Sequence, residues 1–236
     1  MHPIIQQIRE ELNANVDQKT KDTAQHFFKE AVTCYGVKSA TVSKISYKNW
    51  SEIKNLSKKD IFALCEELFI SGLMEEAFIA AGWLPKLVDQ FQREDLSVFE
   101  RWIGCYIDNW AKCDSFCNHT VGDFMIKFPE CVNILFDWTK SGNRWFRRAA
   151  AVSLIVPAKE GLFLQEAFKI SDLLITDSDD LVQKGYGWLL KAETEKHPFE
   201  VLTYVMENKL VMPRTALRYA IEKLPKEQKL LAMKKG

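Results

Sequence analysis

The sequence has 236 residues, enough for one large domain or two small ones, and 47% of them are hydrophobic. Its 32 Lys and Arg residues balance 32 Asp and Glu residues, which gives a formal net charge of zero. This balance excludes binding to nucleic acid through an overall basic excess, so such binding requires a local cluster of cations.

The N-terminal segment M-H-P-I-I-Q-Q-I-R-E-E predicts the start of an amphipathic helix and lacks the apolar stretch of a secretion signal. The six cysteines include no C-x-x-C pair. No apolar run reaches the roughly 20 residues that a membrane span requires. We therefore expect reduced cysteines in a cytoplasmic protein that makes no membrane contact.

Helical periodicity dominates the rest of the chain. Hydrophobic residues follow a helical spacing over residues 74–87, 98–107, 149–155 and 217–224. Residues 41–47, T-V-S-K-I-S-Y, are the one weak candidate for a strand. The pattern predicts an all-α protein.

Prolines and a polar cluster mark where these helices begin and end. Asp177, Ser178 and Asp179 predict an N-cap for the helix that follows. Prolines separate the other helices, at positions 85, 129, 157, 198, 213 and 225. Because no linker or low-complexity tract divides the chain, we expect a single domain over residues 1–236.

A diverged internal repeat is visible in the second half. A shift of about 36 positions lays residues 145–154 over 181–190, and the same register fits again near Met212. Arg148, Lys184 and Arg214 then share one repeat position, each followed by small residues that let helices approach closely. Repeats of this kind stack into a curved superhelix, and a cation at one register lines one of its surfaces. Such a row suits a phosphate backbone.

Trp110 and Asp114 lie four residues apart and so share a helical face. A core tryptophan beside a solvated aspartate is the ordinary interpretation of this pair. The neighbouring Lys112 points away from that face, so it is not placed as a nucleophile for a Schiff base.

Two further helices combine aromatic and basic residues. Arg144 and Arg148 lie four apart, while Lys184 and Lys191 flank Trp188 at minus four and plus three. These faces suit an anionic polymer. The alternative is a surface helix with its tryptophan packed underneath and lysines that keep it soluble.

Signals for a cofactor or metal are absent from the sequence. Cys113, Cys117 and His119 do not match the ligand spacing of a zinc site. The sequence has no phosphate-binding glycine loop, no G-x-S-x-G and no H-E-x-x-H. We expect no metal and no cofactor.

At these residues the chain resembles the AlkD-like family of DNA alkylation-repair proteins, the HEAT-like-repeat DNA glycosylases. The matching segments are W110-x3-D114-S, 122–129, N-R-W-F-R-R-A-A-A over 143–151, and Q-K-G-Y-G-W-L-L-K over 183–191. The resemblance implies a right-handed, C-shaped α-solenoid of HEAT-like helix pairs, whose concave basic face grips duplex DNA. We expect the protein to be a monomer.

The resemblance also implies roles for individual residues in the removal of alkylated purines. Trp110, Trp188 and Asp114 occupy the places of the two tryptophans and the aspartate that line the cleft beside the lesion. Asp114 would stabilise the positive charge that develops on the deoxyribose and orient water, and the tryptophans would pack on the sugar. The expected phosphate partners are Arg144, Arg148, Lys184, Lys191, Arg214 and Arg218.

Two departures from the family pattern keep other functions open. Ala111 stands where active members commonly carry an acidic residue, and residues 36–43 lack the family's Thr-Pro and arginine. The first alternative is a non-catalytic protein that binds branched or distorted DNA. The second is a helical-repeat module for protein interaction, which would be favoured if the cations paired with acids such as Asp108 and Asp180.

Overall fold

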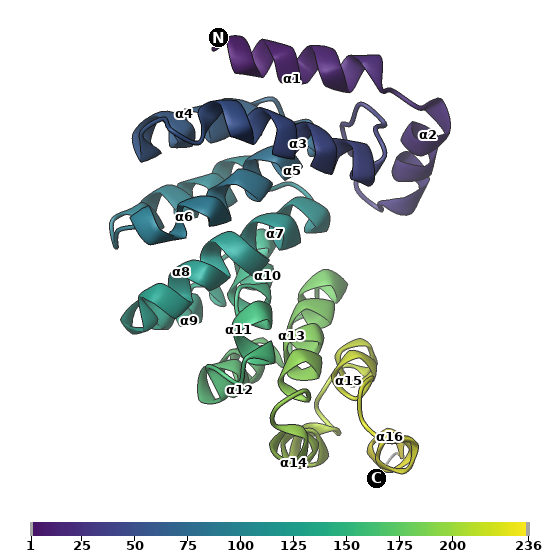
Figure 1. Cartoon of the computed structure of the whole chain (residues 1–236). Helices are drawn as coiled ribbons and strands as arrows, with labels where there is room; N and C mark the ends of the chain where they lie inside the picture. Colours follow the sequence, from purple (N-terminus) through teal and green to yellow (C-terminus); the bar gives the residue numbers. More distant parts are fainter. Residues whose placement is uncertain (1, 235–236) are drawn as a thin grey trace. The chain divides into compact units, whose positions relative to one another are not determined.

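The computed structural model describes residues 2–234, and that part of the chain contains helices and no β-strand (Figure 1). This confirms the prediction of an all-α protein. The helices group into two compact units, one ending at Phe116 and the other beginning at Cys117. A single domain over residues 1–236 stays a prediction.

From residue 2 onward, the first unit consists of seven α-helices and one 3-10 helix. Their bounds are α1 Pro3–Ala14, α2 Gln18–Phe27, α3 Ser39–Ile53, α4 Lys58–Ile70, α5 Met74–Trp83, η1 Leu84–Gln90, α6 Asp95–Tyr106 and α7 Trp110–Phe116. Helix α5 packs against α3, α4 and α7. The core between α4, α6 and α7 is aromatic, with the rings of Phe69, Trp102 and Phe116 5.4–6.0 Å apart.

The strand suggested for residues 41–47 is wrong, because this segment lies inside α3. Its buried side chains, Val42, Ile45, Asn49 and Ile53, are three or four residues apart, which is the spacing of one helical face. The alternation of apolar and polar side chains over these seven residues shows only part of that helical spacing. The segment is helical because its apolar face packs against α1 and α5.

Two buried carboxylates at the start of α5 organise the segment that leads into α3. Glu75 accepts hydrogen bonds from the backbone N–H groups of Tyr35, Gly36 and Val37 at 2.8–3.0 Å. Glu76 accepts two from Arg9, both at 3.0 Å, and one from the Tyr35 hydroxyl at 2.7 Å. These bonds hold residues 35–37, which lead into α3, in place without any contribution from the side chains of α3.

As far as residue 234, the second unit contains nine α-helices, one π-helical turn and one 3-10 helix. Their bounds are η2 Cys117–Val121, α8 Gly122–Lys127, η3 Pro129–Asn133, α9 Ile134–Trp138, α10 Arg144–Val152, α11 Ile155–Lys159, α12 Leu164–Leu174, α13 Asp180–Glu193, α14 Pro198–Asn208, α15 Arg214–Ala220 and α16 Lys226–Met233. Helix α13 contacts both α10 and α15. The three segments of the predicted repeat therefore form neighbouring helices.

The predicted helix boundaries are confirmed for most of the prolines and for the polar cluster. Pro198 opens α14, and Pro213 and Pro225 are the N-caps of α15 and α16. Pro157 differs, since it lies within the first turn of α11, where a missing N–H costs little. Asp179 caps α13 by accepting hydrogen bonds from the first N–H groups of that helix, at 2.9 and 3.4 Å.

Small residues allow α13 to approach its neighbours closely, as the repeat predicted. A Cβ atom added at Gly187 would lie 2.7 Å from the carbonyl oxygen of Ala216 and 2.8 Å from Cβ of Tyr219. One added at Gly185 would lie 3.5 Å from Cγ of Arg148, at ordinary contact distance. The α13–α15 contact therefore depends on glycine, whereas the α10–α13 contact has room for a methyl group.

Candidate nucleic-acid interface

Trp110 opens α7 and is half-buried under two phenylalanines from the end of α2. Its ring stacks on Phe28, with centroids 5.2 Å apart and 25° between the planes, and meets Phe27 edge-on at 5.8 Å. This aromatic pair was not among the predicted site residues. In the sequence, the pair is visible as two adjacent aromatic residues at the end of an otherwise polar helix.

Asp114 lies one turn further along α7 and is 8% exposed. The predicted proximity of Trp110 and Asp114 on one helix is thus present. Lys112 is not available for chemistry, because its Nζ donates hydrogen bonds to the Gly72 carbonyl at 2.7 Å and to Asp108 at 2.9 Å. This confirms that Lys112 points elsewhere.

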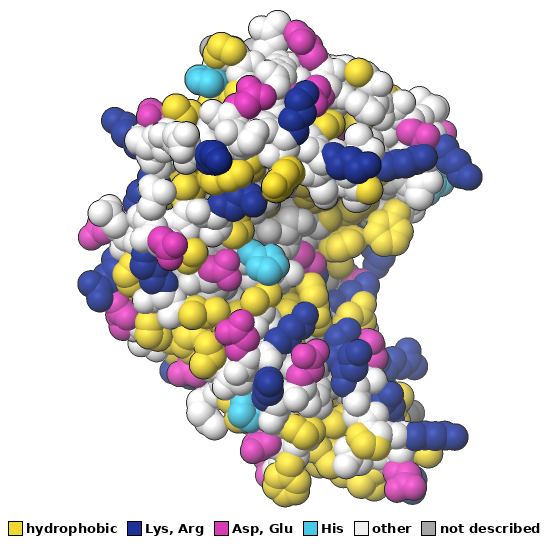
Figure 2. Space-filling view, viewed as in Figure 1, with side chains coloured by type: hydrophobic (Ala, Val, Ile, Leu, Met, Phe, Trp, Pro, Cys, Tyr) yellow, Lys and Arg dark blue, Asp and Glu magenta, His cyan; other side chains and the backbone are white. Residues whose placement is uncertain are grey.

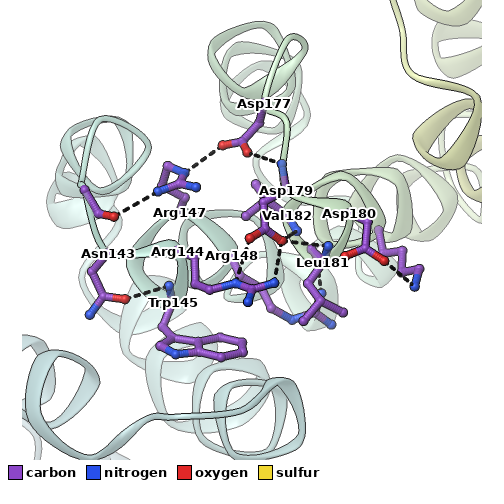
Figure 3. Close-up of polar contacts among 12 residues, drawn as sticks. Asn143, Arg144, Trp145, Arg147, Arg148, Asp177, Asp179, Asp180, Leu181 and Val182 are labelled. Atoms are coloured by element: carbon purple, nitrogen blue, oxygen red, sulfur yellow. Dashed lines mark hydrogen bonds and ion pairs between the residues drawn. The ribbon is translucent and has the colours of Figure 1, made fainter. Parts of the chain in front are cut away.

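In the second unit, several cations of α10 and α13 are held by aspartates at or just before the start of α13 (Figure 3). Arg144 makes a two-pronged contact with Asp179, at 2.7 and 2.8 Å. Arg147, which was not among the predicted phosphate partners, pairs with Asp177 at 2.7 Å.

Arg148 is 5% exposed and donates a hydrogen bond to the backbone carbonyl of Leu181. The stem of its side chain lies against Gly185. Its guanidinium is therefore anchored to the first turn of α13, where it lies close to the ion pairs of Arg144 (Figure 3).

Further along α13, Trp188 is half-buried. In the sequence it lies between Lys184 and Lys191. Lys184 lies 3.2 Å from Asp180, and Lys191 lies 3.0 Å from Glu222 and over the ring of Tyr219. These ion pairs include the Lys184–Asp180 pair that favours a protein-interaction module.

Helix α15 carries the remaining two predicted cations, both exposed. The Arg214 guanidinium lies 3.4–3.5 Å from the carbonyl oxygen of Met233. Arg218 follows one turn later in the same helix. A phosphate would reach these two arginines without displacing a carboxylate that the structure describes.

The model of the DNA alkylation repair enzyme family matches residues 8–224 of the chain. The chain belongs to this family. The resemblance to AlkD-like proteins is thereby confirmed, and the match covers both units. No curated protein matches this family member at a significant level.

Two solved structures are similar to this DNA alkylation repair family member in fold. A predicted DNA alkylation repair enzyme from Enterococcus faecalis is 19% identical, covers 90% of this chain and 98% of its own, and gives a TM-score of 0.79. The alkylpurine DNA glycosylase AlkC from Pseudomonas fluorescens, bound to DNA with an abasic site analogue, is 18% identical with a TM-score of 0.52. That match covers 98% of this chain and 65% of AlkC. At these identities the likeness shows the helical-repeat fold.

The described residues were also compared with the requirements of a membrane-spanning helix and of a metal site. None of their helices is both long and apolar enough to cross a bilayer. Residues 2–234 contain no group of three His, Cys, Asp or Glu side chains that could hold a metal ion.

The predicted site residues of this family member are therefore divided between the two units. Trp110 and Asp114 lie together in the first unit, while Trp188 and the six cations lie in the second. Convergence of Trp110, Asp114 and Trp188 on one lesion stays a prediction, as do the right-handed, C-shaped course of the solenoid and its concave basic face.

Proposed function

We propose that this protein binds duplex DNA and removes purines alkylated at N3 or N7 by hydrolysing the N-glycosidic bond. The observation that carries the proposal is the pairing of the largely buried Asp114 with the half-buried Trp110 on α7. Membership of the DNA alkylation repair enzyme family supports it.

The proposed chemistry requires little beyond these residues. Alkylation at N3 or N7 places a positive charge on the purine, which makes it a good leaving group. As the bond breaks, positive charge builds on the deoxyribose, and the Asp114 carboxylate stabilises it and orients the attacking water. The faces of Trp110 and Trp188 favour the same charge through their quadrupoles. No strand cleavage follows, because Lys112 is held by Asp108 and the Gly72 carbonyl.

DNA binding is assigned to the five accessible cations of the second unit, with the buried Arg148 anchoring the first turn of α13 beside them. The exposed Arg214 and Arg218 contact phosphates directly, whereas Arg144, Lys184 and Lys191 exchange a carboxylate for a phosphate. Each phosphate contact formed should release counterions and make binding salt-dependent. The protein is proposed to act as a cytoplasmic monomer without a metal or cofactor.

The test is release of 7-methylguanine or 3-methyladenine from methylated duplex DNA by the purified protein. We expect free base to appear in proportion to protein concentration, with the DNA strand left intact until heat or alkali cleaves the abasic site. No release by the wild-type protein would exclude the glycosylase and leave DNA binding open.

A non-catalytic DNA-binding protein is the second candidate, favoured by Ala111. This residue follows Trp110 and lines a cavity. Because it is an alanine, Asp114 has no acidic neighbour at that position. Such a protein would bind branched or distorted duplexes more tightly than regular ones and release no base. The paired cations of α10 and α13 suit a protein partner as well, and a helical-repeat interaction module would show no affinity for any DNA.

A further inference from the structure

A second cavity of the first unit lies between α3, α5 and α7, next to the one that Ala111 lines. It has a volume of about 530 Å³. Its polar lining consists of Ser39, Ser43, Ser46, Tyr47, Lys86 and Ser115. Among the described residues that line it, none is an aspartate or a glutamate. We call it the serine cavity, and the cavity beside Ala111 differs from it because Asp17 and Glu75 contribute to its lining.

One face of α3 supplies most of the hydroxyl groups of the serine cavity. Ser39, Ser43 and Ser46 follow one another at spacings of four and three residues, and Tyr47 lies four residues after Ser43. The Ser43 hydroxyl donates to the Ser39 carbonyl at 3.1 Å. The hydroxyls of Ser39, Ser46 and Tyr47 make no hydrogen bond within residues 2–234. The Tyr47 side chain is 75% exposed, so a ligand can reach this face.

The other walls of the serine cavity are fixed close to this face. On α5, Trp83 Nε1 donates to the Ser46 carbonyl at 3.0 Å, and a Cβ atom added at Gly82 would lie 3.2 Å from the Ser46 hydroxyl oxygen. On α7, Ser115 directly follows Asp114, and its hydroxyl makes no hydrogen bond to the described part of the chain. The cavity is therefore preformed, which lowers the entropic cost of binding.

Lysines give the serine cavity a positive surrounding. The exposed Lys86 places its Nζ 5.7 Å from the centroid of the Trp50 ring and makes no ion pair within residues 2–234. Residues 38–51 contain three lysines and no acid, although Lys38 and Lys48 lie 3.8 and 3.2 Å from carboxylates outside this range. Figure 2 shows Lys and Arg side chains over α2 and α3. An anion in the cavity would meet donors without displacing a carboxylate from Lys86.

We propose that the serine cavity binds a phosphate of the DNA backbone, in addition to the phosphates contacted by the second unit. The hydroxyls of Ser46, Tyr47 and Ser115 donate to the phosphate oxygens, and Lys86 neutralises the charge. Serine, tyrosine and lysine side chains contact phosphates in protein–DNA complexes whatever the base sequence. Because Ser115 follows Asp114, the contact brings the backbone to the part of α7 that carries this carboxylate, and no base leaves the duplex. The inference rests on the proposed function for contact with DNA, but not on catalysis.

The experiment measures affinity for a labelled paired duplex by fluorescence anisotropy at several salt concentrations. Lys86→Ala should lower the slope of log K against log salt by about one unit, because one phosphate charge fewer is neutralised. Ser46→Ala/Ser115→Ala should weaken binding at least about five-fold through two lost hydrogen bonds. It should leave the slope unchanged, since a hydroxyl releases no counterion. Both effects should be equal for two duplexes of unrelated sequence.

The matched controls come from α3, outside the serine cavity. Ser51→Ala removes an exposed hydroxyl that donates only to the Lys48 carbonyl, at 2.7 Å, within the described chain. Lys54→Ala removes an exposed lysine at the C-cap of the helix. Both should bind within two-fold of wild type, with an unchanged slope. Because Lys86 is exposed, its variant tests the cavity even if the serine variant loses stability.

Wild-type affinity and slope in both cavity variants would overturn the inference, as would losses of equal size in the controls. A loss confined to an RNA duplex of the same sequence would also overturn it. Base release from methylated DNA, measured on the same preparations, reports separately on the proposed function. If the wild-type protein binds the duplex and releases no base, the glycosylase is excluded and the variants still decide the serine cavity. Absence of binding to any duplex overturns both.

Discussion

The two units contain charged residues of different kinds in different surroundings. In the first unit, buried carboxylates bind backbone and side-chain donors, as Glu75 and Glu76 do around Tyr35 and Gly36. In the second unit, cations line neighbouring helices, and aspartates at the start of α13 hold several of them. The first arrangement fixes the shape of a cavity and its surroundings, whereas the second holds individual cationic side chains in place.

This difference explains how a chain with no net charge can be proposed to bind DNA. Arg144 and Lys184 stay ordered by pairing with Asp179 and Asp180, and they remain at least partly accessible. A phosphate that replaces the aspartate finds the cation already in position. The first unit is then proposed to supply the catalytic carboxylate of Asp114, and the second to supply Trp188 and the cations that provide the affinity.

The largest effect is expected from Asp114→Asn. Loss of the charge that stabilises the developing cation should lower the rate of 7-methylguanine release at least about a hundred-fold, while duplex affinity changes less than two-fold. Chromatography of released bases under single-turnover conditions measures the rate. Asp137→Asn is the control, because among residues 2–234 the exposed Asp137 side chain pairs only with the exposed Lys140. A similar loss in both variants would contradict the role given to Asp114.

A single added methyl group should disrupt the contact between α13 and α15. In Gly187→Ala the new methyl group would lie 2.7 Å from the Ala216 carbonyl oxygen, so the free energy of unfolding should fall by about 1–3 kcal/mol. Denaturant titration measures the change. Gly142→Ala, which meets no atom within 4 Å, should stay within about 0.5 kcal/mol of wild type. Equal effects would show that α13 and α15 have room to separate.

Glu193 provides a contrast with the well-bonded acids of the first unit. It is fully buried, and neither carboxylate oxygen has a hydrogen-bond partner within residues 2–234. Burial, together with nearby Glu166, raises the pKa of Glu193 from its ordinary 4.5 to about 8. The folded state therefore keeps a proton that the unfolded chain loses above pH 4.5, and this costs stability as pH rises from about 4.5 to 8.

Glu193→Gln removes that ionisation and should remove the pH dependence with it. We expect the variant to be more stable than wild type at pH 8, by on the order of 2 kcal/mol, and the two proteins to converge towards pH 5. Denaturant titrations at both pH values provide the comparison. A difference between the proteins that is the same at pH 5 and pH 8 would contradict a protonated Glu193.

The smallest effect concerns the pairing of Arg144 with Asp179. Asp179→Asn keeps an N-cap side chain for α13 but removes the charge, so Arg144 should become free to contact phosphate. The slope of log K against log salt should then steepen by up to about one unit, and Arg144→Ala should make it shallower by a similar amount. Titrations of a paired duplex at several salt concentrations measure both. Unchanged salt slopes in both variants would contradict a contact between Arg144 and the DNA phosphates.

Much of the fold was predictable because it depends on local spacing. Hydrophobic periodicity identified the helices, Asp179 identified the start of α13, and glycines after Lys184 identified a close helix contact. Residues 41–47 were the exception. Seven residues are too few to separate a strand from the helical face of α3.

The surroundings of the candidate site were not predictable, because they join residues far apart in the sequence. Arg144 and Asp179 are 35 positions apart, and Gly36 and Glu75 are 39 apart. Trp110 meets Phe27 and Phe28 across separations more than twice as long. Spacing within one helix could place Trp110 beside Asp114, but only the tertiary structure reveals the aromatic pair and the cavity lined by Ala111.

The division of roles between the units is tested most directly by single-turnover release of 7-methylguanine over a range of protein concentrations. Asp114→Asn should lower the maximal rate without shifting the concentration that gives half of it. Lys184→Ala/Lys191→Ala should shift that concentration upward at least about three-fold and leave the maximal rate within two-fold of wild type. A lysine variant that lowers the maximal rate, or an Asp114→Asn protein that keeps it, would contradict the division.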